Sequence, residues 1–207
     1  MKNLFFLFLL IPFIFQACGV CTRKTVTCPS YDSTYRKQWF PYTKGQKLIF
    51  KNATTNTLDT FAVTDCKVID EDESTSYGGY SSKGGLCASE FYIRFLSQQD
   101  TTPLAYYVRH SNYTYMPSKS SSEFGEIRFN FGTFSYKMTE KDSLSATNGS
   151  YLSSFTLENG ITYIGLQSLV TTSKNNTGTY IGKLYIAKGQ GLVGFIEYPS
   201  LQQWAIQ

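Results

Sequence analysis

The residue whose position points most directly to a chemistry is Cys18. It follows Ala17, at the end of a segment in which Lys2 precedes an apolar run over residues 4–15. A charged start, an apolar stretch of this length and a small residue before the cleavage point are features of an export signal. A cysteine directly after that small residue indicates a thiol that becomes acylated. The sequence therefore predicts a lipoprotein signal peptide over residues 1–17, with Cys18 as the lipidated mature N-terminus.

Two alternatives to a lipoprotein signal fit this segment less well. A membrane-spanning helix needs about 20 apolar residues, and this run is shorter and contains Pro12. Ordinary signal cleavage prefers small residues at both −3 and −1, whereas Phe15 occupies −3. Lipoprotein signals usually carry an aliphatic residue at −3 and a small residue at −2, where this chain has Phe15 and Gln16. Cys21 is the weaker acceptor because Val20 precedes it, so we expect acylation at Cys18.

The four other cysteines are Cys21, Cys28, Cys66 and Cys87, an even number in an exported chain. Exported proteins fold where disulfides form, and sequence neighbours favour the pairs Cys21–Cys28 and Cys66–Cys87, one of three connectivities. A metal site is the alternative. Among these four cysteines no two have CxxC spacing, and the chain's only histidine, His110, is distant in sequence, so we favour disulfides.

Composition favours β structure in one domain. Without the signal about 190 residues remain, which is enough for a single domain with a hydrophobic core. Aromatic residues make up 16% of the chain, including 16 tyrosines and 16 phenylalanines, and such side chains fit half-buried pleated surfaces. The net charge of +4, or +3 after loss of Lys2, is too small to indicate a nucleic-acid partner.

Alternating apolar residues predict a series of strands after a polar tether over residues 18–38. The expected strands cover residues 47–51, 58–69, 90–96, 104–109, 113–116, 124–131, 133–139, 151–157, 161–170, 179–188 and 192–198, with a short final strand near Trp204. Asn159-Gly160 between two apolar runs predicts a hairpin with a type I′ turn. We therefore predict one all-β antiparallel domain over residues 39–207, either a curved sheet or half-barrel or a β-sandwich, with little or no helix.

Within the 58–69 strand, the period-two pattern assigns Phe61 and Val63 to one face, and Ala62, Cys66 and Val68 to the other. After this strand the composition changes. Residues 70–85 begin with four acidic residues and continue with glycines around Tyr77 and Tyr80, which predicts a long loop. The acidic run lacks the glycine and the closing glutamate of an EF-hand, so we interpret it as a solvated turn. Tyr77 and Tyr80 are candidates for stacking on a glycan.

Two segments have recognisable sequences. Residues 39–52 read Trp-Phe-Pro-Tyr-Thr-Lys-Gly-Gln-Lys-Leu-Ile-Phe-Lys-Asn, with Asp59-Thr60-Phe61 following, and residues 184–195 read Leu-Tyr-Ile-Ala-Lys-Gly-Gln-Gly-Leu-Val-Gly-Phe, leading to Trp204. Together they resemble small, mostly uncharacterised envelope lipoproteins of the Bacteroidetes type, and the second is also similar to periplasmic half-barrels of the lipoprotein-carrier class. The resemblance implies an envelope lipoprotein with a curved sheet, and no activity. Surface-displayed members often carry acidic residues after the acylated cysteine. Arg23-Lys24 is basic, which favours a periplasm-facing protein.

Catalytic constellations are not evident in the sequence. A Ser/His/acid set would need His110, which is expected in a loop, and there is no GxSxG turn. Glu126, Glu158 and Glu197 are available for carboxylate chemistry, but no spacing selects a pair. Neither a phosphate-binding glycine loop nor HExxH occurs. We therefore expect a protein that is not an enzyme and needs no metal or cofactor.

Three functions follow as hypotheses. The first is a non-enzymatic binding or structural β domain tethered to a bacterial envelope membrane by its N-terminal lipid. The second is a carrier of lipid or another hydrophobic ligand in an apolar cavity lined by strand aromatics. The third is a glycan-binding module. The expected partners are the membrane together with a lipid, a glycan or another envelope protein.

Overall fold

A computed structural model describes residues 34–73, 86–98, 106–115, 120–129, 131–139, 143–171 and 178–207. The predicted lipid and disulfide residues Cys18, Cys21 and Cys28, and the loop residues Tyr77 and Tyr80, lie outside this part of the chain. The described residues are almost entirely antiparallel β structure in a single domain, which confirms the predicted fold class.

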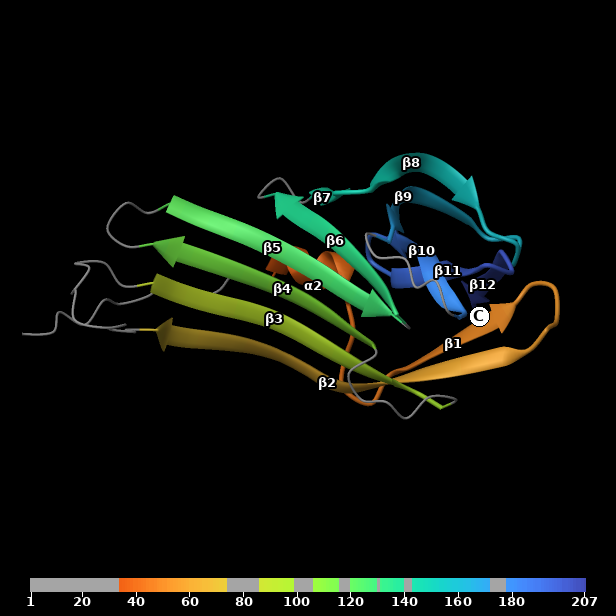
Figure 1. Ribbon diagram of the computed structural model, residues 1–207, viewed down its shortest axis with the longest axis horizontal. Coiled ribbons are helices and arrows are strands. Elements are labelled where there is room, and N and C mark those ends of the chain that lie inside the picture. Colours follow the sequence, from red (N-terminus) through yellow and green to blue (C-terminus); the bar gives the residue numbers. More distant parts are fainter. Residues whose placement is uncertain are drawn as a thin grey trace, which may run out of the picture.

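Twelve strands form one sheet in the order β7-β6-β5-β4-β3-β2-β1-β12-β11-β10-β9-β8. They are β1 (Lys47–Asn52), β2 (Leu58–Glu73), β3 (Leu86–Ser97), β4 (Tyr106–Tyr115), β5 (Ser120–Phe129), β6 (Gly132–Thr139), β7 (Ser143–Ala146), β8 (Gly149–Thr156), β9 (Thr162–Val170), β10 (Tyr180–Ala187), β11 (Gly191–Tyr198) and β12 (Gln202–Ile206). The sheet curls into a nearly closed, barrel-like shape (Figure 1). Of the shapes left open by the sequence, the structure is barrel-like.

Aromatic side chains from opposite walls fill the interior. Phe61 of β2 lies 4.9 Å from Phe129 of β5, between ring centroids, and Phe129 lies 6.1 Å from Phe195 of β11. Phe50 of β1 lies 5.2 Å from Phe195, so the rings form one connected group. Tilted and edge-to-face pairs at such distances add to the free energy of burial. The curled sheet is therefore held closed by its own core.

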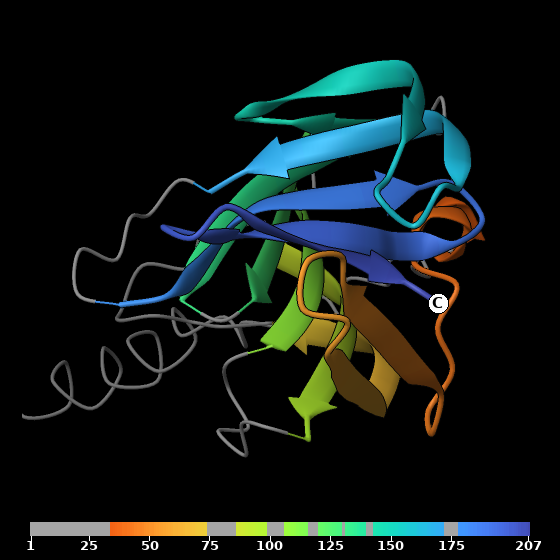
Figure 2. The same ribbon diagram turned by 90° about the vertical axis from the view of Figure 1, so that its right-hand side faces the viewer.

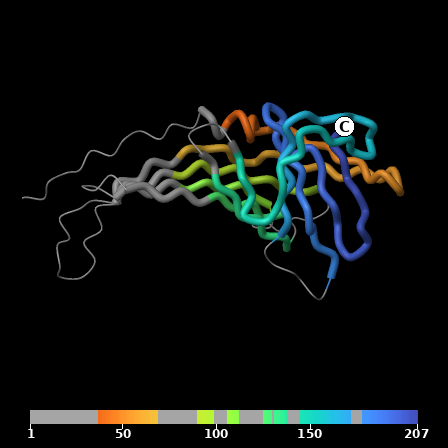
Figure 3. Tube along the Cα trace, turned by 90° about the horizontal axis from the view of Figure 1, so that it is seen from above, coloured from red at the N-terminus to blue at the C-terminus, as the bar shows by residue number. Residues whose placement is uncertain are grey.

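The segment before β1 enters this core. It begins with a short helix, α2 (Thr34–Trp39), so the last residues of the predicted tether are helical. The Phe40 ring packs 5.7 Å from Tyr136 and the Tyr42 ring 5.4 Å from Phe95. The Tyr42 hydroxyl also accepts a hydrogen bond from the Leu192 N–H. Figure 3 shows this segment beside the β10–β11 turn, which it reaches through these contacts.

Two contacts join the walls where the sheet nearly closes. The Thr171 hydroxyl, just after β9, donates to the Thr133 carbonyl at 3.0 Å and accepts from the Thr133 N–H at 3.2 Å. A Cβ on Gly132 would stand 2.1 Å from the Ile181 carbonyl oxygen of β10, so only glycine allows this approach. The start of β6 is thereby held against β9 and β10.

The β8–β9 hairpin makes a second, smaller core on the outer side of β10–β12. Leu157, Tyr163 and Leu166 pack there against the buried side chains Tyr185, Ala187, Val193 and Ala205. The Phe155 ring stacks on Tyr185 at 5.2 Å, and the Asn159 amide donates to the Ile206 carbonyl at 3.0 Å. Figure 2 shows the hairpin curving over these strands.

Several local predictions were wrong. Residues 104–116 were expected to form two strands with His110 between them. Instead His110 lies within the single strand β4 and is buried, because its side chain faces inward. The acidic residues 70–73 extend β2 rather than forming a loop. The 159–160 hairpin exists, but its loop spans residues 157–161 and has a positive φ only at Gly160, so the turn is not type I′.

We predict that Leu157→Ala lowers the free energy of unfolding by about 2–4 kcal/mol, because the buried side chain leaves a cavity over Gly194. Urea denaturation of the purified protein measures this change. Ile164→Ala on the same hairpin is the matched control, since that side chain is 82% exposed and its loss should cost less than about 0.5 kcal/mol. Equal losses for the two variants would contradict the docking of the hairpin.

Candidate binding surface

The outer face of β2–β5 carries an ordered set of tyrosine and charged side chains. Strand register aligns them in two rows across the sheet. One row is Lys67, Tyr92, Arg109 and Glu126, and the neighbouring row is Asp65, Arg94, Tyr107 and Arg128. We call these eight residues the cation–tyrosine surface. Four strands at about 4.8 Å spacing give each row a width of about 14 Å.

Each tyrosine of this surface lies between cations. In the first row Tyr92 stands between Lys67 and Arg109, and in the second Tyr107 stands between Arg94 and Arg128. The Lys67 and Arg94 head groups each lie 5.7 Å from the centre of the Tyr92 ring. The Arg128 guanidinium lies 5.5 Å from the centre of the Tyr107 ring. These distances are within the range of cation–π attraction, so the aromatic rings hold the cations in place.

The two tyrosine rings also contact each other. Their centroids are 6.0 Å apart and their planes are inclined by 29°. In addition, the Arg94 Nε donates to the Tyr92 hydroxyl at 3.2 Å. The rows are therefore joined at their centre.

Carboxylates on the same face pair with the cations and are less exposed than they are. Arg109 Nε is 2.7 Å from Glu90 Oε2, Arg128 is 3.9 Å from Glu126, and Lys67 is 3.5 Å from Asp65. The side chains of Lys67, Arg109 and Arg128 are 46–48% exposed, against 33% for Asp65, 22% for Glu90 and 20% for Glu126. In each pair the cationic side chain is therefore more accessible to solvent than the carboxylate side chain.

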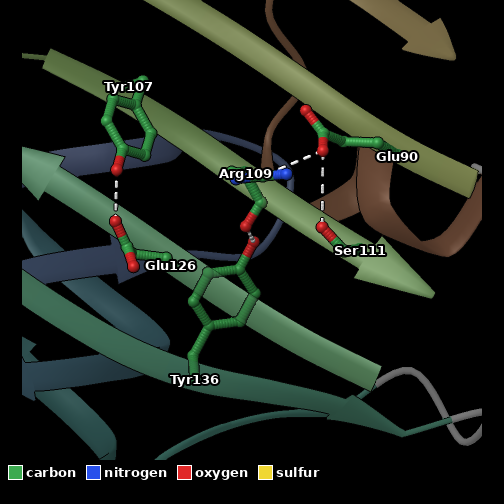
Figure 4. A network of polar contacts seen from close by, with 6 residues as sticks. All are labelled: Glu90, Tyr107, Arg109, Ser111, Glu126 and Tyr136. Atoms are coloured by element: carbon green, nitrogen blue, oxygen red, sulfur yellow. Dashed lines mark hydrogen bonds and ion pairs between the residues drawn. The ribbon is translucent and has the colours of Figure 1, made fainter. Parts of the chain in front are cut away.

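The Tyr107 hydroxyl donates a hydrogen bond to Glu126 (Figure 4). Partial burial, followed by this hydrogen bond and the negative charge of Glu126, raises the pKa of Tyr107 to about 12. The phenol is therefore the donor at neutral pH, and its hydrogen bond orients the Glu126 side chain. Arg109 is likewise positioned by Glu90, which also accepts from the Ser111 hydroxyl at 3.5 Å.

Contacts on the inner face support β4 and β5 beneath the surface. The ring of Tyr136 crosses over Gly125, where an added Cβ would lie 2.4 Å from ring carbons, and its hydroxyl donates to the Arg109 carbonyl at 3.3 Å. Figure 4 shows Tyr136 reaching the β4 backbone in this way. Val108 and Ile127 are buried on the same inner side. The strands that carry the cation–tyrosine surface are therefore held from the inner side by packed core residues.

A β-bulge decides which β2 side chains belong to the surface. The pairing of β2 with β3 shifts register between Val63 and Asp65. The extra residue reverses the alternation, so Asp65 and Lys67 join the outer rows while Cys66 turns toward the core. The prediction that Cys66 and Phe61 occupy opposite faces is wrong for this reason.

The predicted Cys66–Cys87 disulfide is not formed in the structure. Cys66 is a free thiol whose Sγ donates to the Tyr42 carbonyl at 3.4 Å, and burial raises its pKa. Cys66 pairs with Ile93, whereas Cys87, six positions before Ile93 on β3, pairs with Asp72. At about 3.3 Å per residue the two Cα atoms are about 20 Å apart, far beyond the reach of a disulfide. The pair was predicted from closeness in sequence, which does not give the register of β2 against β3.

Sequence reasoning did not identify the cation–tyrosine surface, and the residues it proposed for glycan binding are not described. The signal was present as polar residues at every second position in each strand, such as Glu90, Tyr92 and Arg94. The alignment of these residues across strands depends on register, which a single sequence does not give.

In the described part of the chain no group of three or more His, Cys, Asp or Glu side chains is placed to hold a metal ion. Its helix is too short to cross a membrane, as a span needs 18 or more apolar residues.

No known family model, curated protein or solved structure matches this chain.

Glu126→Gln should lower the pKa of Tyr107, because it removes the charge and the ionic hydrogen bond that favour the protonated phenol. An NMR titration of the Tyr107 Cζ resonance measures the midpoint. In the wild-type protein the folded pKa is about 12 against 10.0 for the ordinary phenol, so the unfolded chain loses its proton first. The free energy of unfolding should consequently fall as the pH rises above about 10. An unchanged midpoint in Glu126→Gln would contradict the contact.

We also expect Cys66 to remain a thiol in the mature exported protein. Peptide mapping after denaturation in N-ethylmaleimide, without reductant, should find the Cys66 peptide fully alkylated. Recovery of a Cys66 peptide linked to a Cys87 peptide would contradict the register of β2 and β3.

Proposed function

We propose that this protein is a lipid-anchored component of a bacterial cell envelope, with a non-enzymatic β domain that binds a partner outside the cytoplasm. The cation–tyrosine surface carries the binding part of this proposal. It gathers four cations, three of them about half exposed, on one face of a domain with a packed core. The export signal and Cys18 carry the anchoring part.

The length of the tether is compatible with this arrangement. Residues 19–33 separate Cys18 from the start of α2 at Thr34. Fully extended, these 15 residues would span at most about 50 Å, which allows the domain to reach partners well away from the bilayer surface. Arg23 and Lys24 in this segment favour an orientation toward the periplasm, because lipoproteins displayed on the cell surface often carry acidic residues at these positions instead.

A carrier of hydrophobic ligands is less well supported. The strand aromatics that would line its cavity, such as Phe61, Phe129 and Phe195, instead contact one another across the interior. The same side chains cannot both close the core and line a large apolar pocket without rearrangement. A glycan-binding role gains support, since tyrosines and hydrogen-bonding charged groups lie together on an open face of the sheet.

The anchor is tested by expressing the full chain and its Cys18→Ala variant in a bacterial host. We expect the wild-type protein in the membrane fraction, with a mature mass that begins at residue 18 and includes acyl chains. The variant should lose the acyl mass and the membrane association. If the two proteins show equal masses and both occur in the soluble fraction, the anchoring proposal is wrong.

A further inference from the structure

We propose that the cation–tyrosine surface binds an acidic polysaccharide, one whose sugar units carry both hydroxyl and carboxylate groups. This inference rests on the proposed binding function and specifies its ligand.

The tyrosine rings are not open platforms for a neutral sugar. Lys67 and Arg94 cover Tyr92 at 5.7 Å, Arg128 covers Tyr107 at 5.5 Å, and the two rings lie against each other. A neutral sugar that stacked on either ring would have to displace a cation and lose its attraction to the ring. An anion needs no displacement, because the cations are already held where it would bind.

The outermost groups attract negative charge. The side chains of Lys67, Arg109 and Arg128 are more exposed than those of their paired carboxylates Asp65, Glu90 and Glu126. Three of the four cations of the surface are arginines, whose planar guanidinium suits a carboxylate through two parallel hydrogen bonds. The alternation of cations in two rows offers several such contacts along a polymer.

The carboxylates determine what kind of anion fits. A ligand with only anionic groups would be repelled by Asp65, Glu90 and Glu126, which lie within 4 Å of their cations. A sugar acid also has hydroxyl groups, which can donate to the remaining lone pairs of these carboxylates while its own carboxylate binds an arginine. The mixed surface therefore matches an acidic glycan better than a phospholipid headgroup or inorganic phosphate.

The test is isothermal titration calorimetry of the mature protein with an oligogalacturonate and with maltotetraose as a neutral sugar. The protein is taken from whichever fraction contains it, so the result does not depend on the lipid anchor. We expect binding of the acidic sugar, weaker binding at higher salt because exposed charges are screened, and no binding of the neutral one.

The variant Arg94→Gln/Arg128→Gln removes one cation from each side of Tyr107. Each lost charge-assisted contact should weaken binding about tenfold or more. The matched control is Lys47→Gln/Lys183→Gln, which changes the net charge equally. Lys47 is exposed on β1, and Lys183 lies over another ring, Tyr185, at 5.1 Å. This control should bind within about twofold of the wild-type protein, since neither lysine belongs to the surface.

Four results would overturn the inference. Equal binding of the neutral sugar would assign the surface to neutral glycans, and equal losses in the two double variants would mean attraction by net charge alone. Binding to phosphatidylglycerol vesicles but not to the acidic sugar would replace the glycan by a membrane. No binding to any of the three would reject the ligand class. None of these results bears on the acyl mass at Cys18, so failure of the ligand assignment is distinguishable from failure of the anchor.

Discussion

The contact of aromatic rings across the interior is the constraint on which the architecture depends. Phe61, Phe129 and Phe195 come from strands that are far apart in the sheet order, yet their centroids lie 4.9–6.4 Å apart. These contacts require the sheet to curl until its walls meet, and the curvature brings β6 against β9 and β10. The Thr133–Thr171 hydrogen bonds are then made at a seam that the core has already brought together.

The outer face depends on register, which the core also fixes. Period-two alternation means that burying Phe91, Ile93 and Phe95 of β3 exposes the residues between them. The same rule holds for β4 and β5, so the polar rows are the outer counterpart of the aromatic interior. In β2 the bulge near Thr64 shifts the alternation by one residue, so the residues after the bulge face the opposite side from the one that the pattern before it predicts. That local irregularity adds Asp65 and Lys67 to the rows and turns Cys66 inward.

The sequence predicted the fold class well because its signals were local. Alternation, turn residues and composition identified most strands of the described chain within a few residues. The wrong predictions concern long-range relations. Residues 70–73 were assigned to a loop because they are acidic, although they extend β2, and the Cys66–Cys87 pair was inferred from closeness in sequence. His110 was assigned to a loop because a polar triplet, His-Ser-Asn, interrupts the apolar pattern. In each case the pairing of the segment with its neighbouring strands outweighs the local polar sequence.

Stability alone does not account for the charged outer face. Ion pairs between exposed side chains typically contribute about 0–1 kcal/mol, because solvent screens the charges and ordering long side chains costs entropy. The Arg109–Glu90 and Arg128–Glu126 pairs are of this kind, with arginine side chains 46% exposed. An arrangement in which tyrosines and carboxylates hold cations in fixed positions therefore gains little for folding. It does reduce the entropy that those cations would lose on binding an anion, and that advantage is realised only when a ligand is present.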